Sequence, residues 1–158
     1  MMKHTISILC DDVPGVMTRI SGLFSRRGFN IESLSVGNTD KTGKSRFTIV
    51  VNGDDTVLEQ VRKQLQKLIN VINVWDYKEE SIVSREHALI KLKADRKHRT
   101  ELLQLVAATQ ARIVDSSGEL WILEVTGDTG GVDSIINLFS HYEIVESIRT
   151  GKIALKRG

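Results

Sequence analysis

Apolar residues recur along this chain at every second position in some segments, as in strands, and at helical spacing in others. The same order of these segments occurs twice. Residues 3–10 alternate, with Ile6 and Ile8 on one face, which is typical of a strand. The apolar residues after position 15 recur at helical spacing up to Gly28, a residue type that commonly ends a helix. The first half continues with strands at 30–38 and 46–52 joined by a turn, a helix at 55–68 and a strand at 71–77.

The second half repeats this order. Its expected elements are a strand at 87–93, a helix at 97–109, a hairpin of 111–115 and 120–126, a helix at 132–139 and a strand at 143–150, with a short extension at 152–156. The polar stretch 78–85 has no clear period and is expected to be a linker. Each half therefore has the order βαββαβ, which predicts an α+β fold of two consecutive ferredoxin-like domains, 1–79 and 80–158.

A four-stranded sheet with both helices on one face leaves its other face or its edges unprotected. The strand at 46–52 carries apolar residues on both faces, with Phe47, Ile49 and Val51 opposite Val50. Such a strand needs a partner surface. We therefore expect a homodimer, formed by edge pairing or by helix packing. The fold itself hosts many functions and does not decide the activity.

Length and composition narrow the class of protein. A chain of 158 residues with 41% hydrophobic and 27% charged residues is ordinary for a globular protein with a buried core. The formal net charge is only +2, and Lys and Arg are spread along the chain, which argues against a nucleic-acid partner. The one cysteine, Cys10, cannot form an internal disulfide, and no segment approaches the roughly 20 apolar residues that span a bilayer. We expect a cytoplasmic protein without a membrane partner.

The most informative segment, residues 12–16, joins the first strand to the first helix. Pro14 presets φ at the helix entry, and Gly15 has no side chain where the backbone turns. The N–H groups of residues 15–17 would then point outward from a helix N-terminus, which favours a carboxylate. Asp12 beside them could accept hydrogen bonds from an ammonium group. These features suit an α-amino acid, although the same residues could form only a helix cap and a turn.

Other candidate chemistries fit the sequence less well. Cys10 and His4 lie six residues apart on one strand, about 20 Å, which is beyond the reach of a nucleophile and its base. The four histidines are scattered, without the spacing of metal ligands. Residues 27–29 resemble the start of an RNA-recognition signature, but the aromatic residues that should follow are absent. We therefore expect no catalytic residue, no metal site and no enzyme activity of the chain by itself.

Residues 12–16, placed after a strand and before a helix, resemble the ligand loop of ACT domains, which sense amino acids. The stretch 23–34, which contains Arg-Arg-Gly-Phe-Asn-Ile-Glu-Ser, is similar to the small regulatory subunit of acetohydroxyacid synthase, also called acetolactate synthase. Residues 58–68, 85–91 and 148–151 are similar to the same family. The resemblance therefore runs nearly from end to end.

This resemblance implies a homodimer in which two N-terminal ACT domains form an eight-stranded sheet, with valine at their interface. The loop of one subunit and the segment after the first helix of the other would hold the ligand. In bacterial small subunits Asn is common at the position of Asp12, whereas aspartate is frequent in the wider ACT family. The implied contacts are Asp12, Val13, Pro14, Gly15 and Val16 on the loop, and Asn30 and Ile31 on the facing segment.

The implied function is that of a regulatory subunit of acetolactate synthase in branched-chain amino-acid biosynthesis. The chain would bind valine, or else leucine or isoleucine, for feedback inhibition, and would activate the large catalytic subunit. Thiamine diphosphate, FAD and magnesium would belong to that large subunit, and this chain would hold no cofactor. The alternative is a free-standing ACT module that senses an amino acid and regulates another enzyme.

Overall fold

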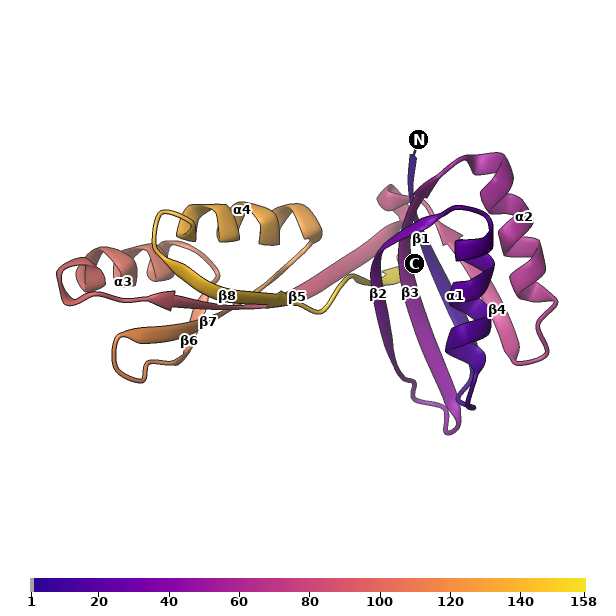
Figure 1. The fold of residues 1–158 in the computed structure, drawn as a ribbon, viewed down its shortest axis with the longest axis horizontal. Helices are drawn as coiled ribbons and strands as arrows, with labels where there is room; N and C mark the ends of the chain where they lie inside the picture. The colour runs from indigo at the N-terminus through magenta and orange to yellow at the C-terminus, as the bar shows by residue number, and fades with distance from the viewer. Residues whose placement is uncertain (1) are drawn as a thin grey trace. The chain divides into compact units, whose positions relative to one another are not determined.

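The computed structural model describes residues 2–158 and divides the chain into two compact units, which comprise residues 2–83 with 152–158, and residues 84–151 (Figure 1). Met1, where the expected first domain begins, lies outside the described residues. The first unit extends four residues past the boundary expected at residue 79. It also contains the last seven residues, which the sequence pattern assigns to the second domain.

The first unit is a four-stranded antiparallel sheet in the order β2-β3-β1-β4, so that β2 and β4 are its edges. Both helices cover one face of this sheet (Figure 1). The predicted ferredoxin-like order is confirmed. Its elements are β1 (Met2–Asp11), α1 (Val16–Arg26), β2 (Asn30–Asn38), β3 (Lys44–Gly53), α2 (Asp55–Gln66) and β4 (Val71–Tyr77).

The core of the first unit forms where the apolar stripes of the helices meet one face of the sheet. On β1 the alternation places Ile6 and Ile8 in this core, whereas Thr5 and Ser7 point to the opposite face. The apolar residues at helical spacing are the ones that α1 and α2 bury, because a helix with 3.6 residues per turn brings residues at this spacing onto one face. The buried helix residues are Val16, Ile20, Leu23 and Phe24 of α1, and Leu58, Val61 and Leu65 of α2.

The opposite face of this sheet is also covered, which the sequence analysis did not predict. The cover consists of η1 (Glu79–Ser81), the start of β5 (Ile82–Lys93) and β9 (Ile153–Lys156), which pairs with β5. Its apolar part is a cluster of Tyr77, Ile82 and Ala154. The stretch 78–85 is therefore not an irregular linker, because Ile82 is buried and the Ser81 carbonyl accepts a hydrogen bond from the Arg157 N–H at 2.8 Å.

The second unit repeats the arrangement, with strand order β6-β7-β5-β8. The alternating residues Ala88, Ile90 and Leu92 of β5 lie in its core. No helix within residues 2–158 is long and apolar enough to cross a membrane. The further elements of this unit are η2 (Arg96–His98), α3 (Arg99–Ala108), β6 (Arg112–Asp115), β7 (Leu120–Gly127), α4 (Thr129–Phe139) and β8 (Ile144–Arg149).

Candidate functional site

Of the segment 12–16, residues 12–15 form an exposed loop between β1 and α1, and Val16 begins the helix. Gly15 occupies the N-cap position of α1 with φ of +85°, in the left-handed region that favours glycine. No side chain caps this helix, so Asp12 does not act as the cap that the sequence left as an alternative. Val13 and Pro14 are exposed, and only Val16 is buried, as the first core residue of the helix.

The backbone of this loop leaves hydrogen-bond donors open. The N–H groups of Gly15, Met17 and Thr18 donate to no backbone carbonyl in the described part of the chain, as expected for the first turn of a helix. The N–H of Val16 differs from the expectation, since it faces the Val13 carbonyl at 3.5 Å. Free donors combined with the positive end of the helix dipole can bind a carboxylate.

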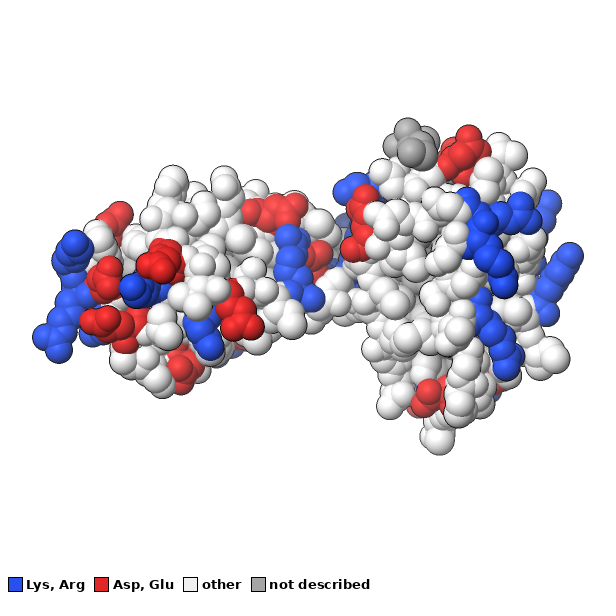
Figure 2. Space-filling view, viewed as in Figure 1, with Lys and Arg blue, Asp and Glu red and all other residues white. Residues whose placement is uncertain are grey.

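Arg19 adds a positive charge to the loop. Its backbone N–H donates to the Gly15 carbonyl at 3.1 Å, and its Nη2 would lie 3.9 Å from a Cβ placed on Gly15. Helix side chains lean toward the N-terminus, so a residue four positions after Gly15 reaches back to it. Sequence reasoning missed Arg19, although this spacing was the available signal. Figure 2 shows further Lys and Arg side chains over the helices of the first unit.

Asp12 supplies the negative group of the loop. Asp12 is exposed, and its backbone N–H donates to the Gly43 carbonyl at 2.9 Å, which ties the loop to the turn between β2 and β3. The Asp12 carboxylate could accept hydrogen bonds from an ammonium group, and Asp12 precedes the first open donor of the helix start, Gly15, by three residues. The loop offers both charges that an α-amino acid requires.

The facing contacts predicted from the resemblance lie at the start of the edge strand β2. Asn30 is exposed, whereas Ile31 is half-buried and packs against the core of its own unit. Successive strand residues point to opposite faces, so a ligand can touch both residues only at the open edge of the strand. Asn52 lies opposite Asn30 on β3, and its buried Oδ1 has no hydrogen-bond partner among the described residues.

Within one chain, the loop and the start of β2 are far apart. Asn30 is level with Asn52 and Lys3, whereas the loop follows Asp11 at the other end of β1. Lys3 and Asp11 are eight positions apart on this strand, which is about 27 Å along the sheet. The structure of one chain therefore brings residues 12–16 together but does not bring Asn30 and Ile31 to them.

Comparisons with known proteins give a consistent result for both units. Residues 6–73 match the family model described as the AHAS small subunit-like ACT domain, and residues 85–158 match that of the small subunit of acetolactate synthase. A protein of Archaeoglobus fulgidus named probable acetolactate synthase small subunit is 52% identical over 99% of this chain and 98% of its own length. The acetolactate synthase small subunit of Mycobacterium bovis is 46% identical over 98% of this chain and 92% of its own length.

The fold agrees with these sequence relatives. The crystal structure of the acetolactate synthase small subunit from Thermotoga maritima is similar with a TM-score of 0.92 and 41% identity, over 100% of this chain and 99% of that one. This chain belongs to the acetolactate synthase small-subunit family.

In this member of the acetolactate synthase small-subunit family, the single thiol is unsuited to nucleophilic chemistry. Cys10 is buried, and its Sγ lies 3.7 Å from the Ser45 carbonyl oxygen. Burial raises the pKa of the Cys10 thiol, and the nearby carboxylates of Asp11 and Asp12 raise it further. His4 instead contacts Asp55, with 2.7 Å between Nε2 and Oδ1. Within residues 2–158, no three His, Cys, Asp or Glu side chains gather as a metal site.

The sheet face away from α1 and α2 carries two aromatic side chains, and both contact neighbouring groups. Trp75 and Tyr77 lie on it with ring centroids 6.5 Å apart, and the Arg46 guanidinium lies 4.5 Å from the Trp75 ring centroid. Tyr77 is buried beside Ile82 and Ala154. RNA-binding domains of this fold stack bases on exposed aromatic residues of the sheet, whereas here Tyr77 is buried and Trp75 is half-buried beside Arg46.

Proposed function

We propose that this chain is a regulatory subunit of acetolactate synthase that binds valine and tunes the activity of a large catalytic subunit. The observation that supports this most directly is the end-to-end family match, combined with an exposed loop that has a left-handed glycine and free N–H donors. Thiamine diphosphate, FAD and magnesium would be held by the large subunit. The complex would work in the cytoplasm, in the synthesis of branched-chain amino acids.

The loop suits each part of an α-amino acid. The ligand carboxylate would accept hydrogen bonds from the N–H groups at the start of α1, beside the Arg19 guanidinium. The ligand ammonium would donate to the Asp12 carboxylate. A branched side chain would contact the exposed apolar surface of Val13 and Pro14, where leucine or isoleucine also fits by chemistry. Val16 is buried and would contribute only its backbone.

A homodimer would complete the site. If the β2 edges of two copies pair antiparallel, the start of one β2 comes level with the end of the other. The end of β2, Asn38, pairs with Ser45, at the end of the sheet where the loop is also tied to Gly43. Antiparallel pairing would therefore bring Asn30 and Ile31 of one copy to the loop of the other, across an eight-stranded sheet.

Regulation would follow from linkage between two states of the complex. Valine can shift the large subunit toward an inhibited state only if it binds the dimer more tightly in that state. A coupling of 1–3 kcal/mol, typical of allosteric proteins, corresponds to roughly a 5–150-fold change in affinity. A site shared between two copies is suited to this role because any change in their pairing alters both halves of the site.

The direct test mixes the purified chain with its large subunit and measures acetolactate formation from pyruvate. We expect no product from the chain alone, a severalfold increase over the large subunit alone when the two are mixed, and inhibition of that increase by valine. Product formation by the chain alone would contradict the proposal. A chain that binds an amino acid but neither associates with nor stimulates the large subunit would instead support the free-standing sensor.

A further inference from the structure

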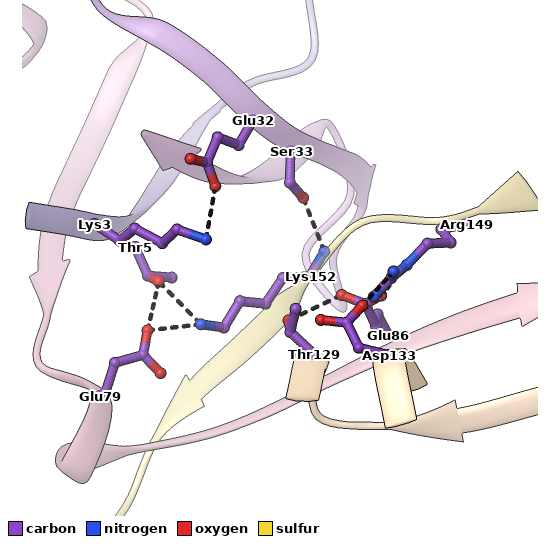
Figure 3. Close-up of polar contacts among 10 residues, drawn as sticks. All are labelled: Lys3, Thr5, Glu32, Ser33, Glu79, Glu86, Thr129, Asp133, Arg149 and Lys152. Carbon is purple, nitrogen blue, oxygen red and sulfur yellow. Dashed lines mark hydrogen bonds and ion pairs between the residues drawn. The ribbon is translucent and has the colours of Figure 1, made fainter. Parts of the chain in front are cut away.

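The most unusual side chain in the first unit is a lysine near the C-terminus. Lys152 is only 8% exposed, although lysine is almost never fully buried without a partner. Its Nζ lies 2.6 Å from Glu79 Oε1 and 3.2 Å from Thr5 Oγ1, and the Thr5 hydroxyl donates to the same Glu79 oxygen at 3.0 Å (Figure 3). The amine is thus held between β1 and η1, on the sheet face away from the helices.

The backbone of the same residue holds the strand that carries the predicted ligand contacts. The Lys152 N–H donates to Ser33 Oγ of β2 at 3.1 Å (Figure 3). Ser33 lies at a β-bulge, because the register with β3 shifts between Ile31 and Ser33 and leaves Glu32 unpaired. Lys3 Nζ contacts Glu32 Oε2 at 3.1 Å from the neighbouring part of the sheet. The bulge directly after Ile31 is therefore fixed from outside the strand.

We propose that Lys152 is a positioning residue for the ligand site, because it anchors the bulge that sets the direction of Asn30 and Ile31. This proposal rests on the valine-binding function proposed above. A bulge re-aims the residues beside it, so its geometry decides where the start of β2 meets the loop of a second copy. The side chain of Lys152 does not touch the ligand in this scheme and acts only through Ser33 and the backbone of β2.

The lysine side chain is needed because the amine fixes the position of the whole terminal segment. With the amine bound to Glu79 and Thr5, the backbone N–H of Lys152 stays within reach of Ser33. The hydrogen bond from Lys152 lowers the pKa of the Glu79 carboxyl, which keeps this carboxylate ionised at neutral pH. Without the amine, the segment would keep the apolar contact of Ala154, the backbone bonds of β9 and the bond from Arg157 to Ser81, none of which lies at Lys152 itself.

The test uses the full chain in four variants. Lys152→Met removes the amine and keeps an unbranched side chain up to the ε position, while Lys152→Arg restores a cation. Ser33→Ala removes only the acceptor at the bulge and is the milder change. Lys156→Met is the matched control, because Lys156 is exposed on the same strand β9 and makes none of these contacts.

Two readouts separate this proposal from the proposed function. Backbone hydrogen exchange over residues 30–33 is measured without ligand, and the valine Kd is measured by calorimetry. We expect Lys152→Met to speed exchange and raise the Kd by about tenfold, and Ser33→Ala to do so by roughly fivefold, the size of one hydrogen bond. Lys152→Arg should recover most of the affinity, and Lys156→Met should match the unaltered chain. Stimulation of the large subunit by Lys156→Met should match that by the unaltered chain.

Unchanged exchange at residues 30–33 in both Lys152→Met and Ser33→Ala would overturn the positioning role. So would faster exchange with an unchanged valine Kd, or an equal loss of affinity in Lys156→Met. If the unaltered chain itself binds no valine, the proposed function fails, and the exchange readout still decides whether Lys152 fixes the bulge.

Discussion

Gly15 combines two properties that the ligand loop requires at one residue. Its φ of +85° turns the chain into α1, and its missing side chain leaves space between the loop backbone and the Arg19 guanidinium. A Cβ here meets no atom closer than 3.9 Å, so a substitution would be limited by backbone conformation and charge rather than by a clash. The loop can therefore be altered without disturbing the core beneath it.

Replacing Gly15 with Asp should abolish valine binding and feedback inhibition while stimulation of the large subunit persists. The introduced carboxylate would compete for Arg19 and would repel the ligand carboxylate. Two unit charges about 4 Å apart repel by roughly 4 kcal/mol at an effective dielectric of 20, and each 1.4 kcal/mol is about tenfold in affinity. Calorimetric titration with valine measures this loss directly.

Gly118→Asp provides the matched control. Gly118 also has a positive φ, of +63°, and no atom lies within 4 Å of its would-be Cβ, but it belongs to the second unit. Both substitutions therefore carry a similar backbone cost, and only one adds a charge at the loop. If Gly15→Asp still binds valine as tightly as Gly118→Asp does, the ligand site lies elsewhere.

Single residues also show where sequence reasoning succeeded and where it could not. Gly15 was recognisable because a positive φ at a helix entry selects glycine locally. Lys152 was not, because the group that makes its burial tolerable, Glu79, lies 73 positions away. Hydropathy even favours the wrong face of β9, where Ile153 is 58% exposed and Ala154 is buried.

Element boundaries were predicted best where a local signal fixes both ends. The strands expected at 30–38 and 71–77 agree with β2 and β4. The helix expected at 132–139 begins earlier, at Thr129, because Asp128 caps it by accepting the Gly131 N–H at 2.7 Å. A Cβ on Gly131 would lie 3.0 Å from the Asp128 carboxylate, so this glycine makes room for the cap instead of breaking the helix.

At the scale of elements, the two edge strands of the first sheet allow a test of which edge forms the proposed dimer interface. Val36 on β2 is 42% exposed and Ile72 on β4 is 51% exposed, so each edge offers one comparable apolar side chain. Lysine on an edge strand opposes pairing with another edge. We expect Val36→Lys to weaken the dimer at least tenfold in sedimentation experiments and Ile72→Lys to leave it unchanged. The reverse pattern would move the interface to β4.

At the scale of the whole molecule, the last seven residues belong to the unit that the chain began with. Neither composition nor periodicity could predict this, since β9 follows β8 after only a few residues and continues the pattern of the second half. Long-range contacts, such as the hydrogen bond between Arg157 and Ser81, hold the last seven residues in the first unit. A domain boundary read from local sequence therefore places residues 152–158 with the second half, whereas their contacts lie in the first unit.

A chain that ends at Gly151 should lose stability in its first unit and not in its second. It would lack the buried Lys152 and Ala154 and the hydrogen bonds of β9, together about 2 kcal/mol. For a unit of this size, that loss lowers Tm by roughly 8–16 °C. Each unit has its own tryptophan, Trp75 or Trp121, so fluorescence of single-tryptophan variants reports them separately. A shift only in the Trp121 transition would contradict this expectation.

The late return of β9 also has a consequence during synthesis on the ribosome. At about 5–20 residues per second, residues 84–151 take about 3–14 s to be made, and throughout that time the first unit lacks its last strand. The nascent chain would expose the apolar surface of Tyr77 and Ile82 against which Ala154 packs in the complete chain. A neighbouring nascent chain could insert its own terminal strand there, which is a domain swap. Rapid folding of residues 84–151 would bring the terminus back to its own first unit as soon as it is made, and so keep it with its own chain.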